Sequence, residues 1–414
     1  MIGVRGCRTL VTLAGPARPR VGPELDTLAA IDDGAMLFDG SGTIREVGDR
    51  SHLEAIAPAG TVWHDAGGAV ICPGFVDAHT HLVFAGNRAN EFDMRCRGAS
   101  YSEIAAGGGG IRSTMRAVRD ATEEELLAAG TRHAWWMLRN GTTTAEAKSG
   151  YGLSVADEVK LLRAIRRVGE DTPLDVVPTF LGAHALPPEF DDRREAYVEL
   201  VIDAMLPAVA GLAAFADAFV EPKYFDADAA RRIMAAARKH GLGVRLHVDQ
   251  LTRSGGAELA AELEAKTADH LEQTDADGIA ALARAEVQPV LLPASVYALG
   301  LAKYPDARAM IAAGLAVVVA TDFNPGSSPT PSLPMAMSLA CTQMRMTSVE
   351  AILASTVNAA YSLDLGDRIG SLEVGKRADF LLLPVEDVRE VAYWFGVELV
   401  TEVWKAGQCV FRRG

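Results

Sequence analysis

From residue 73 onward, short apolar runs alternate along the chain with longer segments in which apolar positions recur at helical spacing. The apolar runs predict eight strands, at residues 75–83, 142–147, 174–181, 217–221, 243–248, 267–270, 287–292 and 316–322. The helical spacing predicts connecting helices at residues 123–139, 156–168, 193–205, 228–240, 256–264, 276–285 and 305–313. Strands alternating with helices in this way predict an α/β fold, a (β/α)8 TIM-like barrel over residues 73–362.

Both ends of the chain have a different pattern, in which short apolar pieces are separated by turn residues. These pieces predict strands at residues 35–38, 44–47, 69–72, 400–405 and 408–411, and residues 369–383 predict a turn followed by a buried strand. Neither end is long enough to bury a comfortable core of its own. We therefore expect residues 1–72 and 363–414 to form together one small β-sandwich domain beside the barrel.

The composition is that of a globular protein, with 49% apolar and 23% charged residues among 414. The net charge of −14 argues against a nucleic-acid partner, because contact with phosphates requires a basic surface. The same charge repels an anionic substrate at long range. A site for an anion would therefore need its own local cation.

Cysteine usage and hydropathy bear on the compartment in which the protein works. The five cysteines lie far apart, no pair has C-x-x-C spacing, and arginines interrupt the apolar stretch at the N-terminus. No apolar run approaches the roughly 18 residues of a membrane span. We expect a cytoplasmic protein without a signal peptide or membrane segment.

Five residues of metal-binding type fall at the ends of predicted strands, where a barrel carries its chemistry. They are His79 and His81 on the first strand, His247 on the fifth, His270 on the sixth and Asp322 on the eighth. His79 and His81 are two positions apart and so share one face of an extended strand. A lone histidine of this kind is more often a structural core residue, but five such residues at four strand ends predict a metal site. Histidine and carboxylate ligands with an open position are typical of hydrolytic zinc or iron sites.

At these residues the chain resembles the amidohydrolase superfamily. The similarity lies in Pro73-Gly-Phe-Val-Asp-Ala-His-Thr-His81, in the single histidines of strands five and six, in Thr321-Asp322 and in the stretch 370–379. Within that superfamily the chain is most similar to the imidazolonepropionase family, in stretches at 81–88, 107–111, 148–153, 182–185, 255–260 and 320–328. The resemblance runs from about residue 35 to the end of the chain.

The resemblance implies a reaction and a metal centre. The family hydrolyses the cyclic amide of 4-imidazolone-5-propanoate to N-formimidoyl-L-glutamate in L-histidine degradation. One divalent metal ion, Zn2+ or Fe, would be held by His79, His81, His247 and Asp322, and would lower the pKa of a bound water toward about 7. Asp322 would take the proton from the attacking water and pass it to the leaving nitrogen. His270 would orient the water or polarise the carbonyl.

The resemblance also assigns a set of substrate-binding residues near the strand ends. They are Arg88, Tyr151, His184, Gln250, Asn324, Gly326 and Ser327. Arg88 would pair with the carboxylate of the anionic substrate, and Tyr151 and His184 would form hydrogen bonds to its ring and carbonyl. Gln250 offers both a donor and an acceptor to the ring but is no general base. The stretch that begins at Asn324 would hold the tail of the substrate.

Several alternatives stay open at this point. Lys148 ends the second predicted strand, and some superfamily relatives use a carboxylated lysine there to bridge two metal ions, although a single metal is favoured here. A second hypothesis is a superfamily member that acts on another substrate, as a nucleobase deaminase or a dipeptidase. A non-catalytic barrel scaffold should have lost some of the five strand-end residues, and none is missing. A homodimer is expected from the resemblance and from the frequency of twofold assemblies.

Overall fold

The predicted barrel is present in the computed structural model, which describes residues 1–99, 103 and 108–414. Residue 107, the first of the glycine-rich stretch 107–111, lies outside the described residues. One sheet of eight strands follows the order of the chain, and each strand is parallel to its neighbour. The strands are β8 (Phe75–Asp77), β9 (Thr142–Lys148), β10 (Asp175–Ala183), β11 (Phe215–Val220), β12 (Gly243–Val248), β13 (Thr267–His270), β14 (Gln288–Leu291) and β15 (Val318–Val319). This topology confirms the (β/α)8 fold class.

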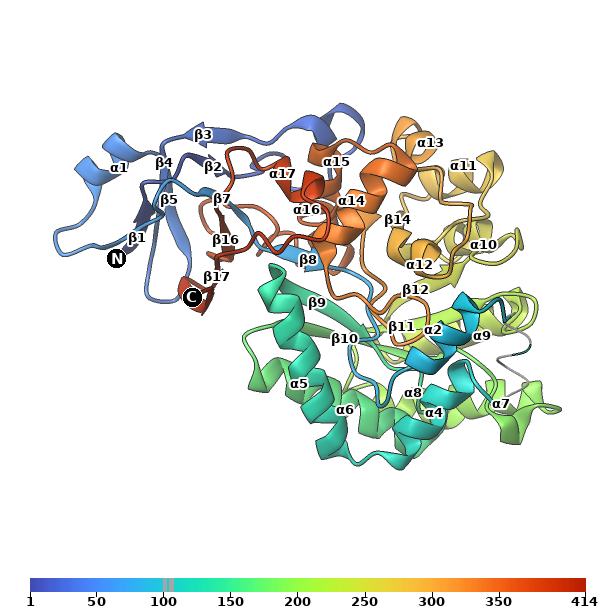
Figure 1. The fold of residues 1–414 in the computed structure, drawn as a ribbon. Helices are drawn as coiled ribbons and strands as arrows, with labels where there is room; N and C mark the ends of the chain where they lie inside the picture. The colour runs from blue at the N-terminus through green and yellow to red at the C-terminus, as the bar shows by residue number, and fades with distance from the viewer. Residues whose placement is uncertain (100–102, 104–107) are drawn as a thin grey trace.

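Most of the helices lie around the outside of this sheet, and one, α1 (Arg50–Ile56), lies beside the sheets formed by the chain ends (Figure 1). Those within the described residues are α1 (Arg50–Ile56), α2 (Ala89–Cys96), α4 (Ile111–Asp120), α5 (Glu123–Arg139), α6 (Val155–Asp171), α7 (Arg194–Leu200), α8 (Leu206–Val209), α9 (Ala227–Lys239), α10 (Gly256–Glu262), α11 (Ala276–Arg284), α12 (Pro293–Ala298), α13 (Ala307–Ala312), α14 (Leu333–Met344), α15 (Ser348–Ala354), α16 (Val357–Ser362) and α17 (Glu390–Tyr393). The 3-10 helices η1 (Gly22–Asp26) and η2 (Pro188–Phe190) and the π-helical turn η3 (Val201–Met205) are shorter. Polar caps fix several starts: Thr122 and Glu125 form a capping box on α5, and Asp226 caps α9.

Three predicted elements differ from the structure. The helix expected at 193–205 is divided into α7, η3 and α8, because a wider π turn interrupts the α-helical pattern. The strands expected at 75–83 and 316–322 are shorter, since β8 ends at Asp77 and β15 covers only Val318 and Val319. His79, His81 and Asp322 therefore lie in the segments that follow these two strands.

Those two segments close the barrel. Thr80 and Phe323 form a parallel β-bridge, His81 N donates to Phe323 O at 2.9 Å, and Asp322 N donates to His79 O at 3.0 Å. The first and last strands thus meet just beyond their ladder ends. This seam brings together residues 79–81 and 322–323, which follow the first and the last strand of the barrel.

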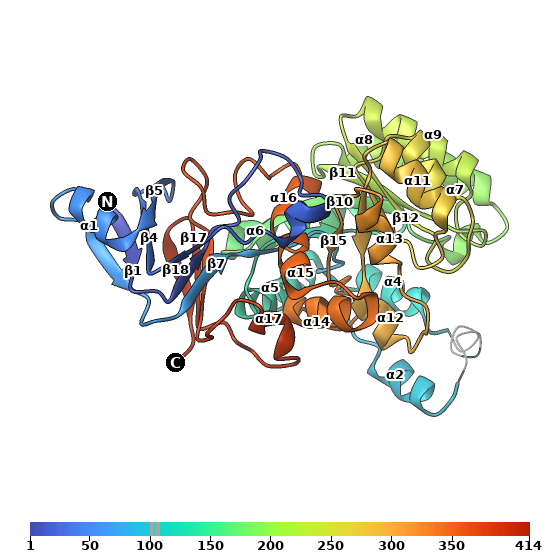
Figure 2. The same cartoon turned by 90° about the horizontal axis from the view of Figure 1, so that it is seen from above.

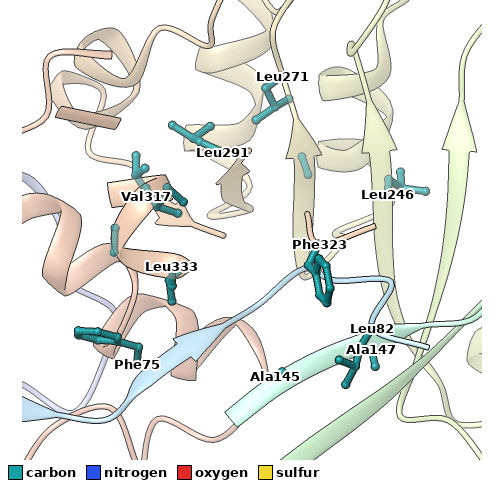
Figure 3. Packing of buried hydrophobic residues seen from close by; sticks show 14 of the residues in the cluster. Phe75, Leu82, Ala145, Ala147, Leu246, Leu271, Leu291, Val317, Phe323 and Leu333 are labelled. Atoms are coloured by element: carbon teal, nitrogen blue, oxygen red, sulfur yellow. The ribbon is translucent and has the colours of Figure 1, made fainter. Parts of the chain in front are cut away.

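Alternation along the strands separates an outer from an inner core. Ala145 and Ala147 on β9 and Leu246 on β12 belong to the large apolar cluster shared with the helices, part of which Figure 3 shows. Val76 and Val318 point the other way and form a second buried cluster with residues of α16. The barrel is therefore filled by side chains on both faces of its wall.

The two ends of the chain meet in two further sheets, next to the barrel (Figures 1 and 2). One contains β5 (Ile44–Asp49), β4 (Gly34–Phe38), β1 (Ile2–Arg5) and β6 (Val62–Asp65), and the other contains β18 (Gln408–Arg412), β17 (Glu402–Lys405), β16 (Phe380–Leu383), β7 (Val70–Pro73), β2 (Thr9–Val11) and β3 (Ala30–Asp32). The antiparallel pairing of β7 with β16 joins the N-terminal and C-terminal parts. Phe380 stacks on Trp404 with ring centroids 5.1 Å apart, in a core shared by both sheets. The small β-domain is confirmed, while its boundaries at residues 72/73 and 362/363 stay a prediction.

Two features bear on the environment of the chain. All five cysteines are free thiols. Within the described residues, no helix combines the length and the apolar character needed to cross a bilayer.

Candidate active site

The closing seam places three of the predicted metal ligands in one cluster. His79 Nε2 lies 3.5 Å and His81 Nε2 lies 3.6 Å from the same oxygen, Oδ1 of Asp322. The backbone bonds between residues 79–81 and 322–323 set these distances. Two histidines and a carboxylate that converge from opposite ends of the barrel sequence form a donor set suited to a divalent metal ion.

His247 and His270 extend the cluster from β12 and β13. The potential ligand atoms of His79, His247 and His270 lie within 4.8 Å of one another, as do those of His79, His81 and Asp322. Side chains of all five residues are at most 4% exposed. Among the described residues, Nε2 of His79 and Nε2 of His247 are buried without a hydrogen-bond partner. A metal ion would supply the partner that these buried nitrogens lack within the described part of the chain.

Two aspartates behind the histidines orient the imidazole rings. Asp269 Oδ2 lies 2.6 Å from Nδ1 of His79, and Asp217 Oδ2 lies 2.9 Å from Nδ1 of His247. A carboxylate beside Nδ1 favours a proton on that nitrogen. The lone pair of Nε2 is then free to bind a metal ion among the histidines. Neither aspartate was predicted from the sequence as part of the site. The available signal was their inward register, because Asp217 and Asp269 alternate with outward apolar residues on their strands.

Lys148 forms part of a buried charge layer below the histidines. Its Nζ lies 2.7 Å from Glu146 Oε1 and 2.8 Å from Asp217 Oδ2, and none of these side chains is exposed. Burial disfavours the ammonium form, but Asp217 and Glu146 outweigh it and raise the pKa of Lys148 above its usual value. Lys148 is therefore held as a cation among carboxylates. The structure argues against a carboxylated Lys148 that bridges two metal ions, because these neighbours would repel a carbamate.

Arg245 lies deeper in the same layer. Its guanidinium lies over the ring of Phe215, 5.4 Å from the centroid, and donates to Ala78 O at 2.8 Å. It also lies 3.6 Å from Asp269. The barrel interior is thus built in levels, from apolar residues through paired charges to the histidine cluster.

Asp322 and His270 differ from the other members of the cluster in backbone and protonation. Their φ angles are +54° and +82°, left-handed conformations that cost non-glycine residues of order 1–3 kcal/mol each and occur preferentially at functional sites. Burial raises the pKa of the Asp322 carboxyl to about 7. Burial opposes the charged form of His270, but the Glu272 carboxylate 3.3 Å from its Nδ1 outweighs this and raises its pKa. Burial therefore makes the Asp322 carboxylate a stronger proton acceptor than an exposed aspartate.

A cavity of about 570 Å3 opens above the cluster. Every predicted substrate-binding residue lines it, together with all of the strand-end residues except His79. The lining also contains residues that the sequence analysis did not single out: Glu91, Arg95, Gly98, Ala99, Ile111, Phe219, Tyr224, Leu251, Leu299 and Leu301. The sequence-predicted residues are thus brought together in one place, with His79 forming part of the floor.

Arg88 stands at the side of this cavity, directly before α2. Its Nε donates to Thr114 Oγ1 of α4 at 2.9 Å. Its guanidinium lies against Gly326, where an added Cβ would come within 2.3 Å of Nη1. A side chain at 326 would therefore displace the guanidinium end of Arg88 from its position against the loop after β15.

Tyr151 and His184 lie against His81. The rings of His184 and His81 stack with centroids 5.2 Å apart, and the Tyr151 ring lies 5.5 Å from His81. His184 Nδ1 lies 3.0 Å from the carbonyl oxygen of Gly150. Burial lowers the pKa of His184 to about 3, so its imidazole is neutral and Nδ1 carries the proton that Gly150 accepts.

Asn324 organises the loop that follows Asp322. Its Oδ1 accepts from the backbone N–H groups of Gly326 and Ser327, at 2.7 and 2.8 Å, and its Nδ2 donates to Asp322 O at 2.6 Å. The polar groups expected to hold the substrate tail thus already have partners within the loop. Direct contact of Asn324, Gly326 and Ser327 with substrate stays a prediction.

Gln250 reaches the cavity from the loop after β12. Glu221 fixes this loop by accepting from Leu251 N at 2.8 Å and from Thr252 Oγ1 at 2.6 Å. This anchoring carboxylate was not recognised in the sequence, where its partners lie 30 residues away. Gln250 itself is half-buried and lines the cavity beside His247.

Comparison with known proteins agrees with the site. The amidohydrolase family model matches residues 70–410, and the chain belongs to the amidohydrolase family. Its relatives place it, more narrowly, among the imidazolonepropionases. It is 58% identical over 409 residues to the imidazolonepropionase of Solibacter usitatus, covering 98% of each chain. Identity to the imidazolonepropionase of Rubrobacter xylanophilus is 50%, covering 87% of this chain and 88% of that one.

Solved structures share the fold at much lower identity. Guanine deaminase from E. coli superposes with a TM-score of 0.75 at 17% identity, and each chain is covered completely. An adenosine deaminase from Xanthomonas campestris gives a TM-score of 0.70 at 20% identity, covering 99% of this chain and 92% of that one. These similarities show a common architecture and carry no argument about substrate.

Proposed function

We propose that this chain opens the five-membered ring of 4-imidazolone-5-propanoate with water and releases N-formimidoyl-L-glutamate, a step in L-histidine degradation. The observation that carries the proposal is one cavity with a His/Asp metal centre at its floor and Arg88 at its side. This arrangement occurs in a chain that is 58% identical, over 98% of its length, to an imidazolonepropionase. The ring amide of this substrate suits the metal centre at the floor, and its carboxylate tail suits Arg88 at the side.

One divalent metal ion, Zn2+ or Fe, would be held by His79, His81, His247 and Asp322. The unpaired, buried Nε2 atoms of His79 and His247 support this ligand set. When bound, the ion supplies a Lewis acid that lowers the pKa of water and polarises the amide carbonyl. Neutral imidazoles suit both metals, and burial lowers the pKa of His79, His81 and His247, which keeps their rings neutral.

Asp322 moves the proton in this reaction. Its carboxylate accepts a proton from the attacking water, whose oxygen forms a bond to the carbonyl carbon. As the ring C–N bond breaks, the same carboxyl group returns that proton to the leaving nitrogen, and the carbonyl carbon becomes a carboxyl group that releases the second proton of the water. Burial raises the pKa of this carboxyl above its usual value, which favours its taking up the proton. His270, which Glu272 orients through Nδ1, is left to direct the water or to donate to the carbonyl oxygen.

The remaining lining residues hold the substrate. The Arg88 guanidinium pairs with the propanoate carboxylate, and this local cation answers the problem that a net charge of −14 sets for an anionic substrate. Tyr151 and His184 form hydrogen bonds to the ring and its carbonyl, and Gln250 offers the ring a donor and an acceptor. The loop stiffened by Asn324, with Gly326 and Ser327, encloses the tail.

We further infer a cytoplasmic homodimer that does not bind nucleic acid. Five free thiols support a reducing compartment, and the charge of −14 opposes contact with phosphates. A twofold assembly is the commonest for soluble enzymes. The barrel would span residues 73–362, with residues 1–72 and 363–414 completing the β-domain.

Metal analysis coupled to an imidazolone turnover assay tests the proposal. We expect the purified protein to contain about one zinc or iron ion per chain and to remove imidazolone absorbance, and we expect chelation to abolish this activity. Deaminase and dipeptidase substrates should be turned over far more slowly. Metal-replete protein without imidazolone turnover would overturn the assignment, and a non-catalytic scaffold would contain no stoichiometric metal.

A further inference from the structure

Two arginines converge on the same glycine at the cavity. The guanidinium of Arg88 lies against Gly326, and Nη1 of Arg95 donates to the carbonyl oxygen of Gly326 at 3.3 Å. Both arginines line the cavity above the histidine cluster. The proposed function assigns a role to Arg88 and none to Arg95.

The register of α2 explains why both arginines face the cavity. Arg88 precedes the helix, and Glu91 and Arg95 follow at three and seven positions, a spacing that keeps all three on one face. All three line the cavity. Arg97 lies on a different face, is 77% exposed and pairs with Asp93 at 2.7 Å. The helix therefore presents one pair of arginines to the ligand and turns another arginine to solvent.

The two cavity arginines lack acidic partners. Within the described residues, neither Arg88 nor Arg95 has a carboxylate oxygen within 4.0 Å of its nitrogens. Glu91, the acid on the same helical face, is engaged elsewhere, because its Oε1 accepts from Gly110 N at 3.1 Å. Guanidinium groups stay charged at any relevant pH. Two like charges at one glycine, without an acid between them, favour an anion that both can bind.

We propose that Arg95 is a second carboxylate-binding residue, which acts with Arg88 and makes the site selective for an acidic substrate over a neutral one. This inference rests on the proposed function for the identity of the carboxylate. Arg88 binds the propanoate from the side of Thr114, and Arg95 binds it from the side of α2, at the edge of the cavity. The competing interpretation is that Arg95 only fastens α2 to the loop at Gly326.

A pair of stable probes separates the two interpretations. Imidazole-4-propanoate carries the acid, and imidazole-4-propanamide has the same shape without the charge. Calorimetric binding to metal-replete wild-type protein, Arg95→Gln and the matched control Arg97→Gln gives three affinities for each probe. We expect Arg95→Gln to weaken the propanoate by about 10- to 100-fold, the value of a hydrogen-bonded ion pair. Binding of the amide should change by less than about twofold, and Arg97→Gln should alter neither probe by more than that, as for other exposed pairs.

The outcomes are distinct. Equal weakening of both probes by Arg95→Gln would show that Arg95 only fastens α2, and unchanged binding of the acid would exclude any contact; either result overturns the proposal. Arg95→Lys should fall between the wild type and Arg95→Gln, because an ammonium keeps the charge and loses the planar fork. Failure of the proposed function is separable: absent imidazolone turnover with an Arg95-dependent preference for the acid would refute the reaction and support the anion site.

Discussion

The floor of the cavity, formed by the histidine cluster and the charges beneath it, and its mouth, formed by α2, differ in how firmly their residues are held. At the floor, Asp217, Lys148 and Asp269 are fully buried and connected to one another or to the histidines by several contacts. At the mouth, α2 contains no buried residue, and Figure 2 shows it at the edge of the molecule, far from the terminal sheets. The Arg95 side chain there makes one long hydrogen bond of 3.3 Å and lies over the exposed ring of Phe92, 6.0 Å from its centroid. The proposed chemistry therefore lies where many contacts fix the geometry, and the proposed selectivity for the acid depends on residues that few contacts fix.

Because of this difference, substitutions at the floor and at the mouth should impair different properties of the protein. A substitution at the floor removes a charge or a ligand that cannot rearrange, so the metal centre or the stability of the fold should suffer. A substitution at the mouth should cost affinity for the acid and leave metal content and stability intact. The effects should also decrease from floor to mouth.

Asp322→Asn should have the largest effect. The amide keeps the shape and loses the proton acceptor, so turnover should fall by about 10^3- to 10^4-fold. Imidazolone absorbance under saturating substrate measures it. Asp77→Asn is the matched control: burial also raises the pKa of Asp77 to about 7, but its carboxylate accepts from Thr321 and does not line the cavity. It should retain most of the turnover. Near-normal rates for Asp322→Asn would refute its role as the base.

Lys148→Met should cost stability. The substitution leaves Glu146 and Asp217 buried together without their cation, and broken buried ion pairs cost about 3–5 kcal/mol. Urea unfolding of the metal-free proteins measures the free energy of unfolding. Lys266→Met removes an exposed partner of Asp364 and should cost less than about 1 kcal/mol. A similarly small cost for Lys148→Met would show that the charge layer is not essential to the barrel.

Asp217→Asn should weaken metal binding by about 10- to 100-fold, because the carboxylate that orients His247 is lost. Competition with a chromogenic chelator measures the affinity. Asp249→Asn is the control, since Asp249 is equally buried but accepts from the backbone of Gly256 and touches no histidine. Both variants should lose some stability, and only Asp217→Asn should lose metal affinity. Equal affinities in the two variants would exclude the orienting role.

The sequence predicted the parts of the site that follow from strand-end position. His79, His81, His247, His270 and Asp322 are found together because parallel strands carry their carboxyl ends to one face of a barrel, a rule that needs only strand order. Arg88 and the loop after β15 came from resemblance to a family. Their convergence in one cavity follows from the same topology.

The rest of the site depends on contacts that no local pattern contains. Glu146 and Lys148 read as polar positions of an ordinary strand, and their burial depends on Asp217, about 70 residues away. Arg95 reads as one more exposed helical arginine, equal to Arg97, until the loop at Gly326 distinguishes them. The predicted length of β15 was too great for a related reason. Its apolar run continues into the closing seam without forming ladder pairs.

Thr114→Val should have the smallest effect. The methyl group replaces the hydroxyl that accepts from Arg88 Nε at 2.9 Å, so the cation remains and only its orientation is released. One neutral acceptor is worth about 0.5–1.5 kcal/mol, so binding of imidazole-4-propanoate should weaken by about 3- to 10-fold. Binding of the propanamide, metal content and unfolding should not change, because Thr114 is buried and valine fills its volume. Ser113→Ala, on the same turn of α4, should leave both probes unaffected. If Thr114→Val weakened both probes alike, Arg88 would be a wall of the cavity rather than a receptor for the acid, and the separation of chemistry at the floor from selectivity at the mouth would fail.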